Sequence, residues 1–198
     1  VDMQHTLRAV DEELRGLADD VAAMGDLAVA QVTSAVEVFL RHDLTAAAEL
    51  VRGDAALDAQ DAEIERRAVR FIALRAPVAD DLRRPIVALK IAAQLERCGD
   101  LAKNIAKRAA AMEGPAPPAP GAAIADLGRL AADRLSAIIR AYRDGDAQAA
   151  HAVWLSDTEL DRRHDAVLRQ ILAAMAEGPA SPGDSSHLLF IAKNLERI

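Results

Sequence analysis

The chain has 198 residues, of which 52% are hydrophobic but only 3% aromatic, and much of the apolar share is alanine. Alanine is the best helix former, whereas strands favour β-branched and aromatic residues, so this composition predicts close-packed helices. The net charge of −7 argues against a broad nucleic-acid surface, and the single cysteine excludes an internal disulfide and a cysteine-based zinc site.

No apolar run in the sequence reaches the roughly 18 residues that a membrane span needs. The start of the chain, "VDMQHTLRAVDEELRGL", is charged throughout and lacks the pattern of a signal peptide. These features predict a cytoplasmic protein. The chain begins at a valine and stops inside a helical pattern, so we expect both ends to be truncated relative to the gene product.

The first half of the sequence predicts three helices, which cover about residues 6–41, 44–74 and 81–113. Pro77 ends the second helix, and Asp80 or Asp81 is placed to cap the third. Apolar residues recur on this third helix at alternating steps of three and four, which is typical of bundle packing. This seam consists of Ala88, Ile91, Leu95, Cys98, Ala102, Ile105 and Ala109. Cys98 is therefore interpreted as a packing residue.

The stretch "EGPAPPAPG" holds four of the eight prolines and predicts a semi-rigid linker over residues 114–121. After it, three further helices are expected, near 122–143, near 146–176 and from 185 to the end. Asp184 or Ser185 is the expected cap of the last one.

The two halves repeat one design. "DLTAAAELVRGDAALD" from Asp43 matches "DAQAAHAVWLSDTELD" from Asp146 at an offset of 103, and "IAAQLERC" matches "IAKNLERI" at an offset of 100. The sequence therefore predicts an all-α fold of two tandem, similar three-helix bundles, residues 1–113 and 122–198, the last helix being incomplete.

Acidic residues lie beside the apolar seam at one-turn spacing in both halves. The first half carries Asp54 and Asp58 on one helix and Glu96 and Asp100 on the next; the second half carries Asp157, Asp161 and Glu196. We expect the aspartate that would complete the last motif to be the second residue beyond Ile198. Like charges about 4 Å apart repel by roughly 4 kcal/mol at an effective dielectric of 20, so clustered carboxylates need a neutralising partner. Oxygen-only ligands suit hard or borderline cations. Two interpretations stay open, a cation site and a solvated, salt-bridged face.

The stretch "ALRAPVADDLRRPIVALKIAAQLERCGDLAKNIAKRA", residues 73–109, resembles the signature region of the PhoU family, and the similarity extends over essentially the whole chain. This resemblance implies two similar three-helix bundles and no catalytic activity. It further implies a homodimeric negative regulator of phosphate-starvation signalling, which contacts the phosphate sensor histidine kinase and the ATPase subunit of the phosphate ABC transporter. Such a protein would be cytoplasmic, held peripherally at the inner membrane through these partners.

The resemblance also implies metal sites of magnesium, manganese, iron, zinc or calcium. Asp54, Asp58, Glu96 and Asp100 would form one site, and Asp157, Asp161 and Glu196 the other. Two departures are Cys98, where isoleucine is common, and Leu101, which removes a possible extra ligand.

Two alternatives remain beside a regulatory adaptor. The first is a carboxylate-bridged di-metal helical-bundle enzyme, suggested by the spacing of Asp161 and His164; such enzymes need two motifs of this kind in one core. The second is an inert helical scaffold. No phosphate-binding loop and no Ser/His/Asp set is present in the sequence.

Overall fold

The structure is a computed structural model that describes residues 3–116, 118–177 and 182–198. Every regular element within these residues is an α-helix. The helices are α1 (Met3–Arg41), α2 (Leu44–Gly53), α3 (Ala55–Arg75), α4 (Ala79–Ala110), α5 (Pro118–Asp144), α6 (Ala147–Leu155), α7 (Asp157–Glu177) and α8 (Pro182–Glu196).

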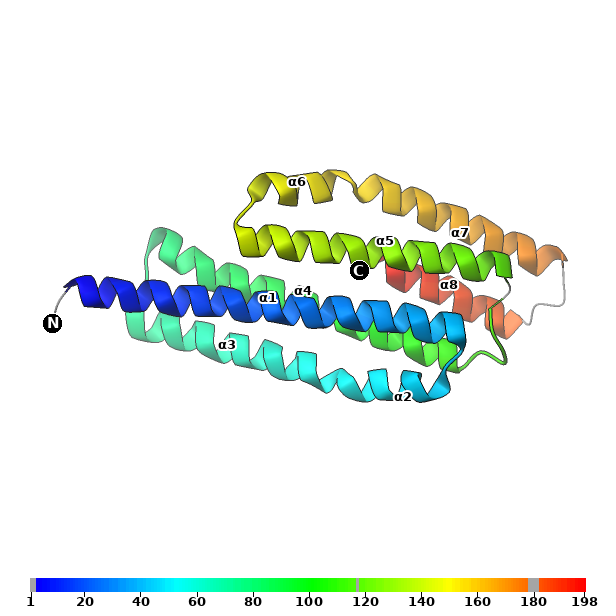
Figure 1. Cartoon of the computed structure of the whole chain (residues 1–198), viewed down its shortest axis with the longest axis horizontal. Helices are drawn as coiled ribbons and strands as arrows, with labels where there is room; N and C mark the ends of the chain where they lie inside the picture. Colours follow the sequence, from blue (N-terminus) through cyan, green and yellow to red (C-terminus); the bar gives the residue numbers. More distant parts are fainter. Residues whose placement is uncertain (1–2, 117, 178–181) are drawn as a thin grey trace.

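The helices form two bundles that pack side by side, as Figure 1 shows. In the first bundle, α1 and α4 pack against each other. Both also pack against α2 and α3, which follow one another end to end. In the second, α5 and α8 pack with α6 and α7 in the same way. The two bundles meet where α1 lies along α5 and α4 lies against α8, and one hydrophobic core runs through both. The predicted all-α fold of two similar three-helix bundles is thereby confirmed.

The middle helix of each bundle is broken, where the sequence predicted a continuous helix over 44–74 and over 146–176. The first break lies at Asp54, between α2 and α3, and the second at Ser156, between α6 and α7. At the first break the amide of Leu57 donates to the carbonyl of Asp54, 2.9 Å away, instead of to that of Gly53. The break follows a glycine in one bundle and uses a serine in the other, and both residues are weak helix formers.

The turn into each broken helix has the same geometry in both bundles. Asp43 accepts a hydrogen bond from the amide of Ala46, and Asp146 accepts one from the amide of Ala149, each 2.9 Å long. Both are N-caps, and the residue before each, His42 or Gly145, has a positive φ of 50° or 66°. The internal repeat therefore extends to the backbone of this turn.

Other helix starts differ from the predictions. Asp80 and Asp81 do not cap α4, whose N-cap is Val78; they lie in its first turn, where carboxylates favour the helix dipole. Asp184 lies in the first turn of α8, which begins at Pro182, and accepts a hydrogen bond 3.0 Å long from the amide of Glu113.

Proline accounts for the early start of α8, because its fixed φ suits the first turn of a helix. α5 likewise begins at Pro118, inside the stretch predicted as a linker. The division into 1–113, 114–121 and 122–198 stays a prediction.

The α1–α5 contact depends on two glycines at repeat-related positions. A Cβ on Gly25 would come closer than 3.0 Å to Ile139, and a Cβ on Gly128 would come as close to Val36. Gly128 is the counterpart of Gly25 at the offset of 103, and Ile139 is the counterpart of Val36. The same glycine–aliphatic contact is thus made twice, once in each direction.

More residues of α4 are buried than the predicted apolar seam contains. All predicted seam residues except the partly exposed Ile91 are buried, Cys98 included. Ala92, Leu101 and Ala106 are buried as well, because α4 packs against α1, α3 and α8. Burial also raises the pKa of the Cys98 thiol from 9.0 to about 11, which suits a packing role.

One stretch of α1 is apolar enough to cross a membrane, contrary to the expectation from the sequence. The stretch spans Arg8–Arg41, and 50% of its most apolar window is buried inside the protein. The core helix of a bundle meets the same criteria of length and composition, so this is weak evidence for a membrane span.

Candidate functional site

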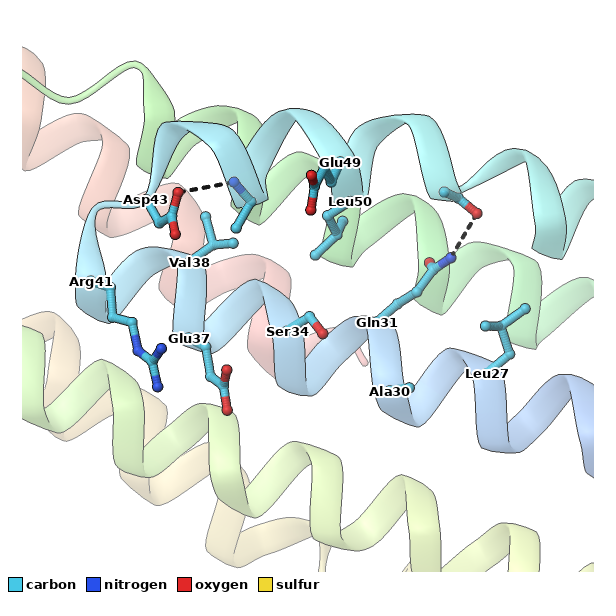
Figure 2. A pocket seen from close by; sticks show the side chains of 12 residues that line it. Leu27, Ala30, Gln31, Ser34, Glu37, Val38, Arg41, Asp43, Glu49 and Leu50 are labelled. Carbon is cyan, nitrogen blue, oxygen red and sulfur yellow. Dashed lines mark hydrogen bonds between the residues drawn. The ribbon is translucent and has the colours of Figure 1, made fainter.

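The break at Asp54 creates the most buried carboxylate among the described residues. The side chain of Gln31 on α1 donates a hydrogen bond 3.3 Å long to the carbonyl of Gly53, which the break leaves without its helical partner. Figure 2 shows this contact at one end of a cleft of about 370 Å³ between α1 and α2. Asp54, the next residue, is 4% exposed, and the Oε1 atom of Gln31 is buried without a hydrogen bond.

Gly99 allows α4 to approach this break closely. A Cβ at this position would lie closer than 3.0 Å to Leu57, 3.0 Å from Gln31 Oε1 and 3.3 Å from Asp54 Oδ1. Leu57 is fully buried, so it has no free space into which to move. The missing side chain of Gly99 therefore brings the motif on α4 against the motif on α3.

Lys103 connects the two acidic motifs. Its ammonium group donates hydrogen bonds to Asp100 on its own helix and to Asp54 across the helix interface. These hydrogen bonds, first that to Asp100 and then that to Asp54, raise the pKa of Lys103 above its ordinary value. The lysine thus supplies one positive charge between two carboxylates.

Other acids around Lys103 keep an excess of negative charge. Burial raises the pKa of Glu96, and so do the charges of its neighbours Asp100, Asp58, Asp61 and Asp54. Burial also raises the pKa of Asp61, with Glu65 and Asp58 adding to the effect. We call Asp54, Asp58, Asp61, Glu96 and Asp100 the acidic cluster. The structure brings the four predicted ligands of the first site into one electrostatic neighbourhood.

The three acids predicted for the second site are arranged differently. Asp157 begins α7 and lines a cleft of about 310 Å³ together with Arg134 and Ile198. Asp161 is exposed on α7, and Glu196 pairs with Lys193 on its own helix at 2.5 Å.

The repeat explains part of this difference. Arg134 stands at the offset of 103 from Gln31, so the second bundle has a guanidinium where the first has a neutral amide. Arg134 Nη1 is buried without a hydrogen bond. His164, considered from the sequence as a metal ligand beside Asp161, is buried, and its Nδ1 lies 3.9 Å from Asp165.

The donor chemistry of the first bundle fits a metal ion, and the second site stays a prediction. The acidic cluster offers only oxygen donors, it has more acids than the single lysine neutralises, and Gln31 Oε1 beside it lacks a partner. Over residues 3–116, 118–177 and 182–198, however, no three His, Cys, Asp or Glu side chains converge closely enough to hold a metal as they stand. A metal in the cluster therefore requires the carboxylates to turn inward.

Gln31, Lys103 and Asp61 are the residues of this site that were not among the predicted ligands. Asp61 and Lys103 both had a signal in the sequence. Asp61 continues the one-turn spacing of Asp54 and Asp58. Lys103 lies one turn after Asp100, the second acid of the predicted pair with Glu96. Gln31 had none, because its repeat counterpart is a different residue type.

This architecture defines the chain as a tandem-repeat, all-helical protein with an acidic motif pair in its first repeat. The PhoU domain family matches residues 21–109 and 124–198. The chain belongs to the PhoU family.

Relatives and solved structures agree with this assignment. The chain is 43% identical to the phosphate-specific transport system accessory protein PhoU homolog of Caulobacter vibrioides, over 98% of this chain and 85% of the relative. It is 39% identical to the homolog of the same name from Xylella fastidiosa strain Temecula1, over 98% of this chain and 80% of the relative. The crystal structure of PhoU from Pseudomonas aeruginosa superposes with a TM-score of 0.89 at 28% identity, over 94% of this chain and 90% of that chain.

Proposed function

We propose that this chain is a regulator of phosphate uptake and phosphate-starvation signalling that acts through protein contacts and not through catalysis. The observation that carries the proposal is the match of the PhoU domain to both repeats, together with relatives named as accessory proteins of the phosphate-specific transport system. Its partners would be the ATPase subunit of the phosphate ABC transporter and the phosphate sensor histidine kinase. The protein would restrain the starvation response as a cytoplasmic homodimer held at the inner membrane by these partners.

A pull-down tests this proposal. Immobilised full-length protein is incubated with the transporter ATPase subunit or the sensor kinase domain of its own organism, with and without a chelator. We expect both partners to be retained. Retention of neither partner under any metal condition would contradict the adaptor function.

We further propose that the acidic cluster binds a metal ion through Asp54, Asp58, Glu96 and Asp100. The support is chemical: all donors are oxygens, and burial and then the charges of neighbouring acids raise the pKa of Glu96, so the cluster has negative charge in excess. A cation with a charge of two or three would take the place that the Lys103 ammonium group occupies between Asp54 and Asp100. Magnesium, calcium, manganese, iron and zinc are the candidates.

A thermal-shift measurement tests the metal proposal. A ligand at a hundred times its Kd stabilises the folded state by about 2.7 kcal/mol, which for a protein of this size raises Tm by about 5–10 °C. We expect such a shift with at least one of the candidate ions, and its loss in the variant Glu96→Ala/Asp100→Ala. The control Glu12→Ala/Asp133→Ala removes two exposed acids elsewhere and should keep the shift.

The two tests separate the two proposals. Equal shifts in both variants would place metal binding outside the acidic cluster and leave the adaptor function intact. Retention of the partners with the chelator present would show that the adaptor works without metal.

A further inference from the structure

A cleft with four arginines lies where the first bundle meets the second. It has a volume of about 610 Å³ and is lined by α1, by the beginning of α4 and by the end of α5 with the turn that follows. On the left of Figure 1, the beginning of α4 and the end of α5 both lie beside the first half of α1. This arginine cleft is separate from the acidic cluster, because the two share no residue.

The charge of the arginine cleft is opposite to that of the whole chain. Arg15, Arg83, Arg84 and Arg143 line it against only two acids, Asp19 and Asp144, whereas the chain carries a net charge of −7. Clustered cations of this kind attract an anionic partner and repel basic ones.

The four guanidinium groups differ in their ion pairing. Arg143 pairs with Asp26 at 2.6 Å, and Arg83 pairs with Asp80 at 3.3 Å in a solvent-exposed pair. Within the part of the chain that the structure describes, neither Arg15 nor Arg84 forms an ion pair. Both are exposed, so both are available to a partner.

The floor of the arginine cleft is apolar. Leu14, Leu17 and Ala88 are buried beneath it, and Val87 is 44% exposed on its wall. Tyr142 also lines it, and burial raises the pKa of this hydroxyl while the charge of Arg84 opposes the effect. The neutral hydroxyl is therefore a hydrogen-bond donor beside Arg84.

These features favour an acidic peptide over a small inorganic anion. Guanidinium groups pair with carboxylates in two-point hydrogen bonds, and an exposed valine beside an apolar floor offers contact to an aliphatic side chain. An inorganic anion would gain nothing from that floor. We propose that the arginine cleft binds an acidic, leucine-containing segment of a partner protein, with its carboxylates on Arg15 and Arg84 and an aliphatic side chain against Val87. This proposal does not depend on the metal site.

A fluorescence-anisotropy titration tests it. The probe is a short fluorescein-labelled peptide of alternating glutamate and leucine, added to the full chain at low ionic strength. The variant Arg15→Ala/Arg84→Ala should weaken binding at least about tenfold, because each lost charge-assisted pair is worth roughly a tenfold change in Kd. The control Arg52→Ala/Arg169→Ala removes two exposed arginines from other faces and should leave Kd unchanged.

Two further peptides and a competing anion test which kind of ligand the arginine cleft binds. A glutamate-only peptide should bind more weakly than the probe, and a lysine–leucine peptide should not bind. Equal Kd values for the two double variants would overturn the proposal, provided that circular dichroism shows both to be folded. Displacement of the probe by pyrophosphate at an equal concentration would also overturn it, because the cleft would then be a site for small anions.

Discussion

At the scale of single residues, the absence of one side chain determines how closely the acidic motifs approach each other. Gly99 lies against Leu57 and beside Gln31 and Asp54. Because glycine has a hydrogen atom in place of a side chain, α4 packs closely against α3 at this point. The acids are therefore held near one another by packing, and Lys103 offsets part of their repulsion.

We predict that Gly99→Ala destabilises the protein. Overpacking of this kind costs about 1–3 kcal/mol, of which the better helix propensity of alanine returns about 0.5–1 kcal/mol. The free energy of unfolding, measured by urea denaturation, should therefore fall. Gly53→Ala is the matched control, because its Cβ would meet nothing within 4 Å, and it should be neutral or stabilising. Equal effects of the two substitutions would show that α4 can move away from Leu57 without cost.

The sequence predicted the carboxylates of the acidic cluster but not their surroundings. Asp54, Asp58, Glu96 and Asp100 follow from one-turn spacing, which places them on a common helix flank. The hydrogen bond from Gln31 to Gly53 depends on a helix break that helix propensity alone did not locate. The predicted caps, Asp80 or Asp81 and Asp184 or Ser185, were wrong, because Val78 is the N-cap of α4 and α8 already begins at Pro182.

At the scale of helices, α1 and α5 form the contact that joins the two bundles. The reciprocal contacts of Gly25 with Ile139 and of Gly128 with Val36 fix the spacing of these helices. The repeat in the sequence predicted that each bundle would have such helices. It did not predict which faces of α1 and α5 meet. From the sequence alone a glycine in a helix indicates only weak helix propensity, and its role in close packing is known only once the opposing residue is known.

A double-mutant cycle tests this contact. Gly128→Ala should destabilise the protein by about 1–3 kcal/mol, and in combination with Val36→Ala, which removes the opposing methyl groups, the loss should be smaller than the sum by about 0.5–3 kcal/mol. Gly128→Ala combined with Ile139→Ala is the control and should be close to additive, since Ile139 opposes Gly25. Additivity in both pairs would mean that Gly128 and Val36 are not coupled.

The ion pair between α1 and α3 gives the stability a pH dependence of known sign. Glu13 accepts a hydrogen bond 2.5 Å long from Arg75, which lowers the pKa of this carboxyl from its ordinary 4.5. The folded state thus binds this proton less readily than the unfolded state, so the pair stabilises the protein above pH 4.5 and the contribution is lost as pH falls.

Glu13→Gln should accordingly reduce the free energy of unfolding at pH 7 by about 0.2–1 kcal/mol, the range for solvent-exposed pairs. The difference from the wild type should shrink toward zero in acid, as followed by urea denaturation at several pH values. A difference that stayed constant with pH would show that the substitution acts through packing and not through charge.

At the scale of the whole molecule, the two bundles share one hydrophobic core. Buried residues from α1 and α4 belong to the same cluster as buried residues from α5 and α8. The sequence predicted two similar units, which is correct, but its proline-rich stretch suggested a spacer between them. α5 begins within that stretch and packs directly on α1, so the units are not independent.

We therefore predict that the bundles unfold in a single cooperative transition. Trp154, whose ring stacks on His151 in the folded state, reports on the second bundle by fluorescence, and the buried thiol of Cys98 reports on the first by its reaction with a thiol reagent. Urea midpoints from these two probes and from circular dichroism should coincide. Separate midpoints would show that each bundle is stable without the other.

The reciprocal glycine–aliphatic contact between α1 and α5 has one more consequence. Two identical halves that were separate chains could pair through such a self-complementary surface. The fraction of paired halves would then depend on the protein concentration. Once both halves belong to one polypeptide, the encounter becomes intramolecular and its outcome no longer changes with dilution. The covalent joining of the two bundles thus keeps the arginine cleft, which lies where they meet, equally complete in a cell that holds few molecules and in one that holds many.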